Sequence, residues 1–165
     1  MFIDTNIHYW SNKLINQIGE YSLLQRLESA QGLSEFSKEE YLKFEKFGYG
    51  RTLEDERIFN GNIVEFSTII WDYVTLGSTK GKIYKICLQK IFANLRTAKK
   101  ILKQVRININ TKIGKYNEHP FLSKKYYWDR DDGNIILEIK SNFGHHSVNI
   151  FFTSNIIREQ YPNIK

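Results

Sequence analysis

Residues 82–106 read KIYKICLQKIFANLRTAKKILKQVR, and this stretch decides which fold the sequence predicts. At about 100° per residue, its apolar side chains fall on one side of a helix. The other side carries the seven cations Lys82, Lys85, Arg96, Lys99, Lys100, Lys103 and Arg106. We therefore predict one long amphipathic helix over residues 82–106, with an apolar side against the core and a purely basic side outward.

The charge around this segment is strongly asymmetric. Residues 73–117 hold 11 basic side chains and no Asp or Glu, whereas residues 1–72 hold 12 acidic and 7 basic ones. The whole chain has a net charge of +6. This pattern predicts a negatively charged partner: an acidic protein, the phosphates of a nucleic acid or an anionic membrane surface. Alternatively, Glu54, Asp55 and Glu56 lie across from the basic side and neutralise it within the protein.

Three further helices are predicted upstream of this segment. Apolar residues at spacings of three and four favour a helix over residues 6–30. Ser37 followed by Glu40 forms a capping box, which predicts the start of a second helix that ends near Gly48. A third apolar stripe favours a helix over residues 52–74, and residues 76–82 form a loop.

Downstream of Lys115 the pattern changes to that of strands. Residues 126–130, 134–140 and 147–153 are rich in β-branched and aromatic side chains, and the pair 132–133 (Asp-Gly) is a hairpin signal. The predicted fold class is therefore α+β in a single domain, residues 1–165. About four helices in the N-terminal two-thirds pack with a C-terminal three-stranded antiparallel β-meander.

The composition excludes several classes of protein. With 41% hydrophobic and 15% aromatic residues, the chain is too apolar to be a disordered tail. Its single cysteine, Cys87, excludes an internal disulfide and a multi-cysteine zinc site, and is expected to be a buried small hydrophobe. The N-terminus lacks the pattern of a signal peptide, and the apolar stretch 63–76 contains Glu65 and Asp72. We expect a cytoplasmic protein without a membrane span and without a cofactor.

One candidate catalytic set is carboxylate-based. Glu138 and Lys140 form a Glu-x-Lys triplet on a predicted strand, which resembles the motif of PD-(D/E)xK nucleases. That resemblance implies that Asp129 and Glu138 hold Mg²⁺ while Lys140 activates water. If the turn is at 132–133, Asp129 pairs with Ile136 and shares a face with the other two. The chain lacks the Pro of the motif, and a solvated strand face explains the same residues.

A second candidate set is built on histidine. His145 and His146 follow a predicted turn and project to opposite faces of an extended strand. With Arg130, Arg158 or His119, either could act as acid or base in a metal-free ribonuclease, as in small toxin ribonucleases. Exposed turn histidines without a catalytic role are the alternative.

The favoured hypothesis is a non-enzymatic binding protein of a small orphan bacterial or phage type. It would neutralise a toxin or an enzyme, as an immunity protein, antitoxin or inhibitor does. The basic helix side and the hairpin aromatics Tyr126 and Trp128 would hold an acidic surface of that partner. The alternative is a nucleic-acid-binding protein or small nuclease, since immunity proteins against nuclease toxins tend to be acidic.

Overall fold

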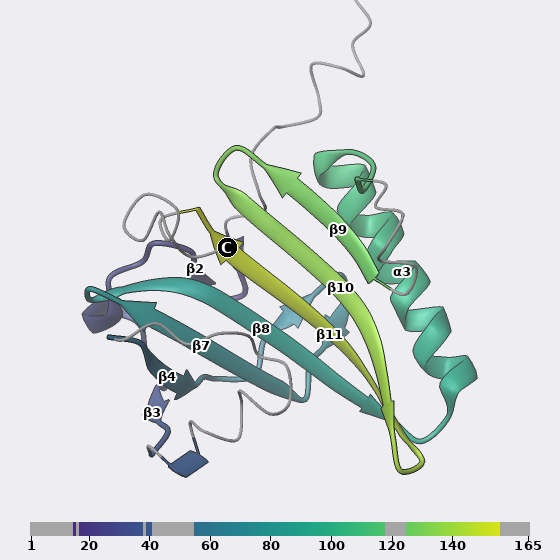
Figure 1. Cartoon of the computed structure of the whole chain (residues 1–165), viewed down its shortest axis with the longest axis horizontal. Coiled ribbons are helices and arrows are strands. Elements are labelled where there is room, and N and C mark those ends of the chain that lie inside the picture. Colours follow the sequence, from purple (N-terminus) through teal and green to yellow (C-terminus); the bar gives the residue numbers. More distant parts are fainter. Residues whose placement is uncertain (1–14, 16, 38, 41–54, 118–124, 156–165) are drawn as a thin grey trace, which may run out of the picture.

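The described residues of the computed structural model are 15, 17–37, 39–40, 55–117 and 125–155, and they are mostly β. A seven-stranded antiparallel sheet runs in the order β3-β4-β7-β8-β11-β10-β9 (Figure 1). Its strands are β3 (Ser34–Glu35), β4 (Arg57–Asn60), β7 (Tyr73–Thr79), β8 (Lys82–Phe92), β9 (Lys125–Arg130), β10 (Gly133–Asn142) and β11 (His145–Ser154). Two small hairpins pair β1 (Gln17–Ile18) with β2 (Tyr21–Ser22) and β5 (Glu65–Phe66) with β6 (Ile69–Ile70).

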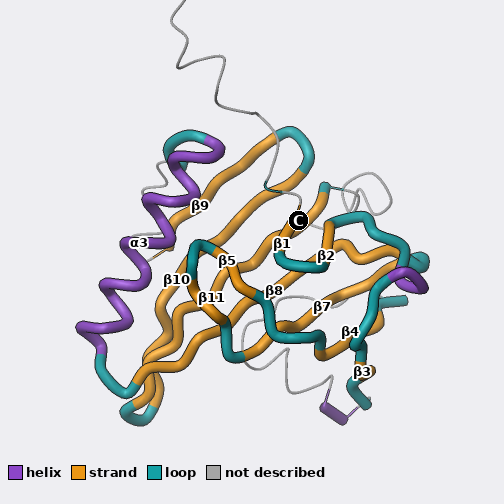
Figure 2. The backbone as a smooth tube through the Cα atoms, turned by 180° about the vertical axis from the view of Figure 1, so that it is seen from behind, coloured by secondary structure: helices purple, strands orange, loops and turns teal. Residues whose placement is uncertain are grey.

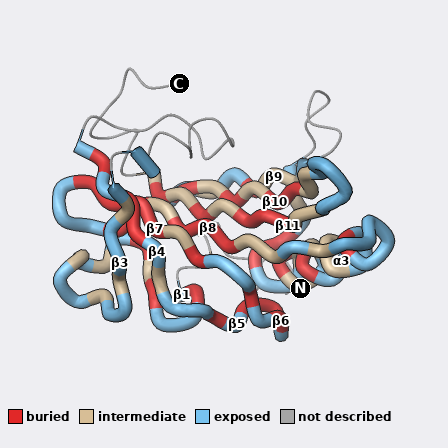
Figure 3. Tube along the Cα trace, turned by 90° about the horizontal axis from the view of Figure 1, so that it is seen from below, coloured by how far each residue is buried: buried red, intermediate tan, exposed pale blue. Residues whose placement is uncertain are grey.

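One face of the sheet is covered by helix α3 (Leu95–Ile113) and by the two small hairpins, which lie on the same side (Figures 2 and 3). The main core fills the space between these layers. Its largest fully buried side chains include Trp71, Trp128, Tyr21 and Phe152. The opposite face of the sheet carries a second, smaller cluster, in which Ile58 packs with Cys87.

The predicted helix over residues 82–106 is wrong in its first half. Residues 82–92 form strand β8, and α3 begins only at Leu95. The apolar pattern misled because β8 is buried on both faces: Ile86 and Leu88 face the main core, while Cys87 between them is buried on the other side. Such double burial removes the alternation that marks a strand. Asn94 caps α3 by accepting hydrogen bonds from the backbone N–H groups of Arg96 and Thr97.

The N-terminal prediction of helices is also wrong. Within 52–74 the chain forms β4, β5, β6 and the start of β7, and the described part of 6–30 forms the β1–β2 hairpin and a 3₁₀ turn, η1 (Leu27–Ser29). Tertiary contacts hold this hairpin: the fully buried Tyr21 donates its hydroxyl to Gln31 O at 2.7 Å and accepts from Asn62 N at 2.8 Å. The Ser37–Glu40 capping box is formed, but the rest of the predicted second helix lies outside the described residues.

The C-terminal meander is present as β9, β10 and β11, with a shifted turn. The β9–β10 turn is at residues 131–132, so Gly133 pairs with Arg130 and Asp129 pairs with Asn134. The meander does not end the sheet, because β11 pairs with β8 and thereby joins it to the N-terminal strands. The predicted loop 76–82 is instead a tight hairpin turn at Lys80 and Gly81 between β7 and β8.

Helix α3 is attached to the sheet through Trp128 on β9. The fully buried indole donates its N–H to Asn110 Oδ1 and to Gly114 O, both at 3.1 Å. Asn110 Oδ1 also accepts from the backbone N–H of Tyr116 at 3.2 Å, which ties down the chain after the helix. No helix among the described residues is long and apolar enough to cross a membrane.

Replacing Asn110 with Ala should therefore lower the free energy of unfolding by about 1–3 kcal/mol, because a buried network loses its shared acceptor. The exposed neighbour Thr111 provides the control, since Thr111→Ala should stay within about 0.5 kcal/mol of the wild type. Urea unfolding followed by tryptophan fluorescence measures both. Equal stability of the two variants would contradict the role given to Asn110.

Candidate functional site

The outward side of α3 carries a group of exposed cations. Four of them are exposed and form no ion pair with any residue that the structure describes: Arg96, Lys99, Lys100 and Lys103. We call these four the α3 cation face. They lie opposite the buried Ala98, Val105 and Ile109. Because the sequence of α3 contains no Asp or Glu, nothing on the helix itself offsets their charge.

The predicted internal neutralisation of this face is not made by the described acidic residues. Asp55 accepts a hydrogen bond from Thr79 Oγ1 at 2.9 Å, and the buried Glu56 accepts one from the Tyr84 hydroxyl. Both contacts are made beside the β7–β8 turn, at the opposite end of β8 from the start of α3. Glu54 lies outside the described residues.

Three predicted cations do not belong to the α3 cation face. Lys82 lies at the β7–β8 turn, far from α3 (Figure 1), and Lys85 lies on β8 with its ammonium 5.5 Å from the Phe151 ring. Arg106 is on α3 but half-buried, and donates to the Tyr126 hydroxyl at 2.8 Å. The basic surface therefore consists of four clustered cations instead of the seven that the sequence pattern predicted.

The predicted aromatic anchors Tyr126 and Trp128 serve the fold. Trp128 is fully buried, and Tyr126 packs edge-to-face on Tyr116 with a centroid distance of 4.9 Å. A partner cannot reach the Trp128 ring without disrupting the α3–sheet contact. The prediction that both residues form part of a docking surface is not supported by these positions.

An aromatic residue that the sequence analysis did not select is Phe143, at the β10–β11 turn. Its side chain is 96% exposed, and its backbone φ is +48°, followed by Gly144 at +82°. A two-residue turn with this geometry favours Asn or Gly at its first position, and a bulky side chain is disfavoured there. The turn lies beside the segment leading from β8 into α3 (Figures 1 and 2), as the pairing of His146 with Phe92 requires. In the sequence, the signal that could have identified this residue is a Phe at the hairpin position that usually holds Asn.

The predicted nuclease set is not assembled. Glu138 is buried between two lysines, 3.3 Å from Lys125 Nζ and 3.4 Å from Lys140 Nζ. Asp129 pairs with Asn134, four residues from Glu138 and about 13 Å away along β10, and not with Ile136 as predicted. The described residues contain no group of three side chains that could hold a metal ion.

The histidine set is likewise dispersed. His146 lies 2.7 Å from Ser141 Oγ through its Nδ1, whereas His145 lines a hollow on the opposite face of the sheet. Arg130 is at the far end of the β10 hairpins, about 30 Å along the strand, where it donates to Ile113 O. Burial lowers the pKa of Arg130. His119 and Arg158 lie outside the described residues.

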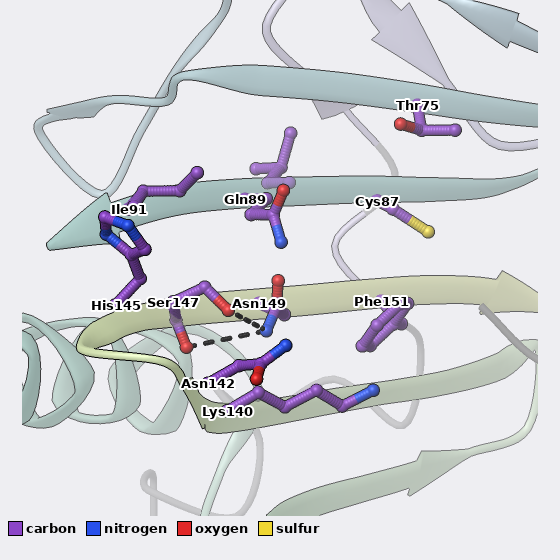
Figure 4. A pocket seen from close by; sticks show the side chains of 11 residues that line it. Thr75, Cys87, Gln89, Ile91, Lys140, Asn142, His145, Ser147, Asn149 and Phe151 are labelled. Atoms are coloured by element: carbon purple, nitrogen blue, oxygen red, sulfur yellow. Dashed lines mark hydrogen bonds between the residues drawn. The ribbon is translucent and has the colours of Figure 1, made fainter. Parts of the chain in front are cut away.

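The hollow lies on the sheet face opposite α3 and has a volume of about 380 Å³ (Figure 4). Side chains of β7, β8, β10 and β11 line it, among them Gln89, Lys140, Asn149 and Phe151. Cys87 is also part of this lining, and burial raises the pKa of its thiol to about 12. The thiol is therefore protonated near neutral pH, which confirms the predicted buried hydrophobe and argues against a nucleophile.

The thiol of Cys87 should react slowly with iodoacetamide. At pH 8 a thiol with this pKa is ionised to about one part in ten thousand, and burial restricts access further. We expect alkylation at least about 100-fold slower in the native protein than in urea, measured by mass spectrometry. Because Cys87 is the single cysteine, the mass shift reports it alone. Equal rates in both states would show that the thiol is accessible.

Comparisons with known proteins do not identify the chain. No protein-family model, no curated protein and no solved structure matches it.

Proposed function

We propose that this protein is a non-enzymatic binding protein that docks on an acidic surface of another protein, such as a toxin that it neutralises or an enzyme that it inhibits. The observation that supports this proposal is the α3 cation face. It places four exposed cations on successive turns of one helix, without an ion pair to any described residue. Such charges add nothing to folding through pairing, and they raise the rate of encounter with a negatively charged partner.

Affinity requires more than steering, because exposed charges at an interface rim contribute little binding energy. Apolar side chains near the cations meet this requirement. Phe143 is 96% exposed and Leu95 37% exposed at the N-terminal end of α3, while Ile107 is 51% exposed beside the cations. A protein partner with an apolar depression inside an acidic surface is complementary to both kinds of residue.

Nucleic-acid binding is the second candidate, favoured by the absence of any acidic residue on α3. Each phosphate contact by a cation would release a counterion and make the affinity fall steeply with salt. The exposed Ile107 among the cations has no role on a phosphate backbone. The exposure of Ile107 therefore favours a protein partner over a nucleic acid.

Charge reversal tests the proposed docking surface. The protein is immobilised, captures its partner from an extract of its source cells, and is then titrated with the purified partner. The triple variant K99E/K100E/K103E should weaken binding at least tenfold and slow association, because steering is reversed. The single variants K100E and K82E form a matched pair with the same change in net charge, and only K100E should weaken binding.

Two results would reject the proposal. One is a captured partner without an acidic surface, or one whose binding responds equally to K100E and K82E. The other is micromolar or tighter binding to mixed-sequence RNA or DNA, measured by fluorescence anisotropy, that falls steeply with salt and disappears in the triple variant. The second result would establish the nucleic-acid candidate.

Substituting Phe143 with Asn separates a role in binding from a role in folding. Asn suits the positive φ of this position, so the free energy of unfolding should stay equal or rise by up to about 1 kcal/mol. Partner affinity should fall at least about tenfold if Phe143 is an anchor. Lys80→Asn is the control, since Lys80 has φ +51° in the equivalent β7–β8 turn. A loss of stability without a loss of affinity would assign Phe143 to the fold.

A further inference from the structure

The hollow opposite α3 is organised in rows, because antiparallel pairing places side chains of neighbouring strands side by side. In one row Thr75 pairs with Cys87, and Cys87 with Phe151. In the next row Gln89 pairs with Asn149, which also pairs with Glu138. In the third row Ile91 pairs with Ser147, and Ser147 with Lys140. All three rows open on the same face of the sheet (Figure 4).

The rows differ in polarity. The first is mainly apolar, with the protonated thiol of Cys87 and the ring of Phe151. The second contributes the amides of Gln89 and Asn149, and the third contributes the hydroxyl of Ser147. The Lys140 side chain starts in the third row and carries its ammonium group back toward Phe151 (Figure 4). Ser147 lies four residues from Phe151, about 13 Å along β11. The hollow therefore holds apolar, neutral polar and cationic groups within the length of a small organic molecule, with the cationic group beside Phe151.

Several polar side chains of this lining have no hydrogen-bond partner among the described residues. The side chains of Thr75, Gln89 and His145 make no hydrogen bond to any residue of the described chain. Asn149 is 6% exposed and uses its amide N–H group on Ser147 Oγ at 3.0 Å, while no described donor bonds to its Oδ1. Donors and acceptors left over in a concave site with an apolar floor are the usual elements of ligand recognition.

The charge at the Phe151 end of the hollow favours an anionic group. The Glu138 carboxylate, 4% exposed, is contacted by both Lys125 and Lys140, so this group of three carries a net charge of +1. The carboxylate is the buried member, whereas the Lys140 side chain is 41% exposed and lines the hollow. A bound phosphate or carboxylate would therefore meet an ammonium group whose carboxylate partner is shielded from it.

We propose that this hollow binds a nucleotide-sized organic anion, a nucleoside monophosphate or a molecule of the same chemistry. Its anionic group lies at the Lys140 ammonium beside Phe151, its polar edge or hydroxyls meet the amides of Gln89 and Asn149, and its heterocycle lies toward Ile91 and His145. The volume of about 380 Å³ is within the range of small-molecule sites. The raised pKa of Cys87 argues against covalent attack by this thiol on the ligand. This site is separate from the α3 cation face and does not depend on the function proposed above.

The test uses AMP, GMP, CMP and UMP as probes on the full chain, with saturation-transfer NMR for detection and calorimetry for affinity. Adenosine and inorganic phosphate are tested alone, to separate the two parts of the ligand. At least one nucleotide should bind with a Kd below about 1 mM. It should bind more tightly than either adenosine or phosphate alone.

Two variants locate the site. Lys140→Met should weaken nucleotide binding at least about fivefold and leave nucleoside binding unchanged, because it removes only the ammonium group. Gln89→Leu should weaken the binding of both the nucleotide and the nucleoside. Gln89 is only half-buried, so this variant avoids a substitution of the buried Asn149. The triple variant K99E/K100E/K103E is the control and should bind nucleotides as the wild type does.

The proposal is overturned if none of the four nucleotides binds at millimolar concentration. It is also overturned if binding survives both Lys140→Met and Gln89→Leu, or if inorganic phosphate alone binds as tightly as the nucleotides. Loss of nucleotide binding in the triple variant would place the anion on α3 and equally reject the hollow. None of these results bears on partner capture by the α3 cation face.

Discussion

Burial of β8 on both faces is the constraint on which the rest of the structure depends. The strand runs over 11 residues and pairs with β7 on one edge and β11 on the other, so it joins the two halves of the sheet. Ile86 and Leu88 face the core beneath α3, whereas Cys87 and Gln89 face the hollow. The hollow and the α3 cation face therefore lie on opposite sides of the same sheet, which makes substitutions on one a fair control for the other.

The same constraint explains where sequence reasoning succeeded and where it did not. The C-terminal strands were predictable because Ile135, Leu137 and Trp128 alternate with more polar residues on the outer face, a pattern of period two. In β8 both faces carry apolar side chains, and Ile83, Cys87 and Ile91 then reproduce the spacing of a helix stripe. The spacing of apolar residues cannot distinguish a helix from a strand that is buried on both faces. The difference is a second layer that covers the strand, and the residues of that layer are remote in sequence. As a result, the basic residues of α3 and those of β8 were interpreted as one continuous basic side of a single helix.

The candidate sites show a similar division. The four α3 cations were selected correctly as an exposed group, because a helix without acidic residues has no local partners for them. Glu138 was interpreted as solvated or catalytic, yet it is buried and held by two lysines. That difference depends on cross-strand pairing, and the register shifted by two residues when the β9–β10 turn formed at 131–132. Register is a property of the folded turn, so the pairing of Asp129 was not available from residue types alone.

At Phe143, the stability of the fold and the proposed function favour different residue types. A phenylalanine with positive φ disfavours the turn, and its 96% exposure gives no burial in return. The β7–β8 turn has the same backbone geometry with Lys80, whose charged side chain suits exposure to water. Nothing in the described fold requires an aromatic ring at the β10–β11 turn, and this turn lies at the end of α3 where the cations begin. An exposed, strained anchor beside charges that no described residue pairs is consistent with a surface shaped by contact with another molecule, because the described fold gives no reason to keep it.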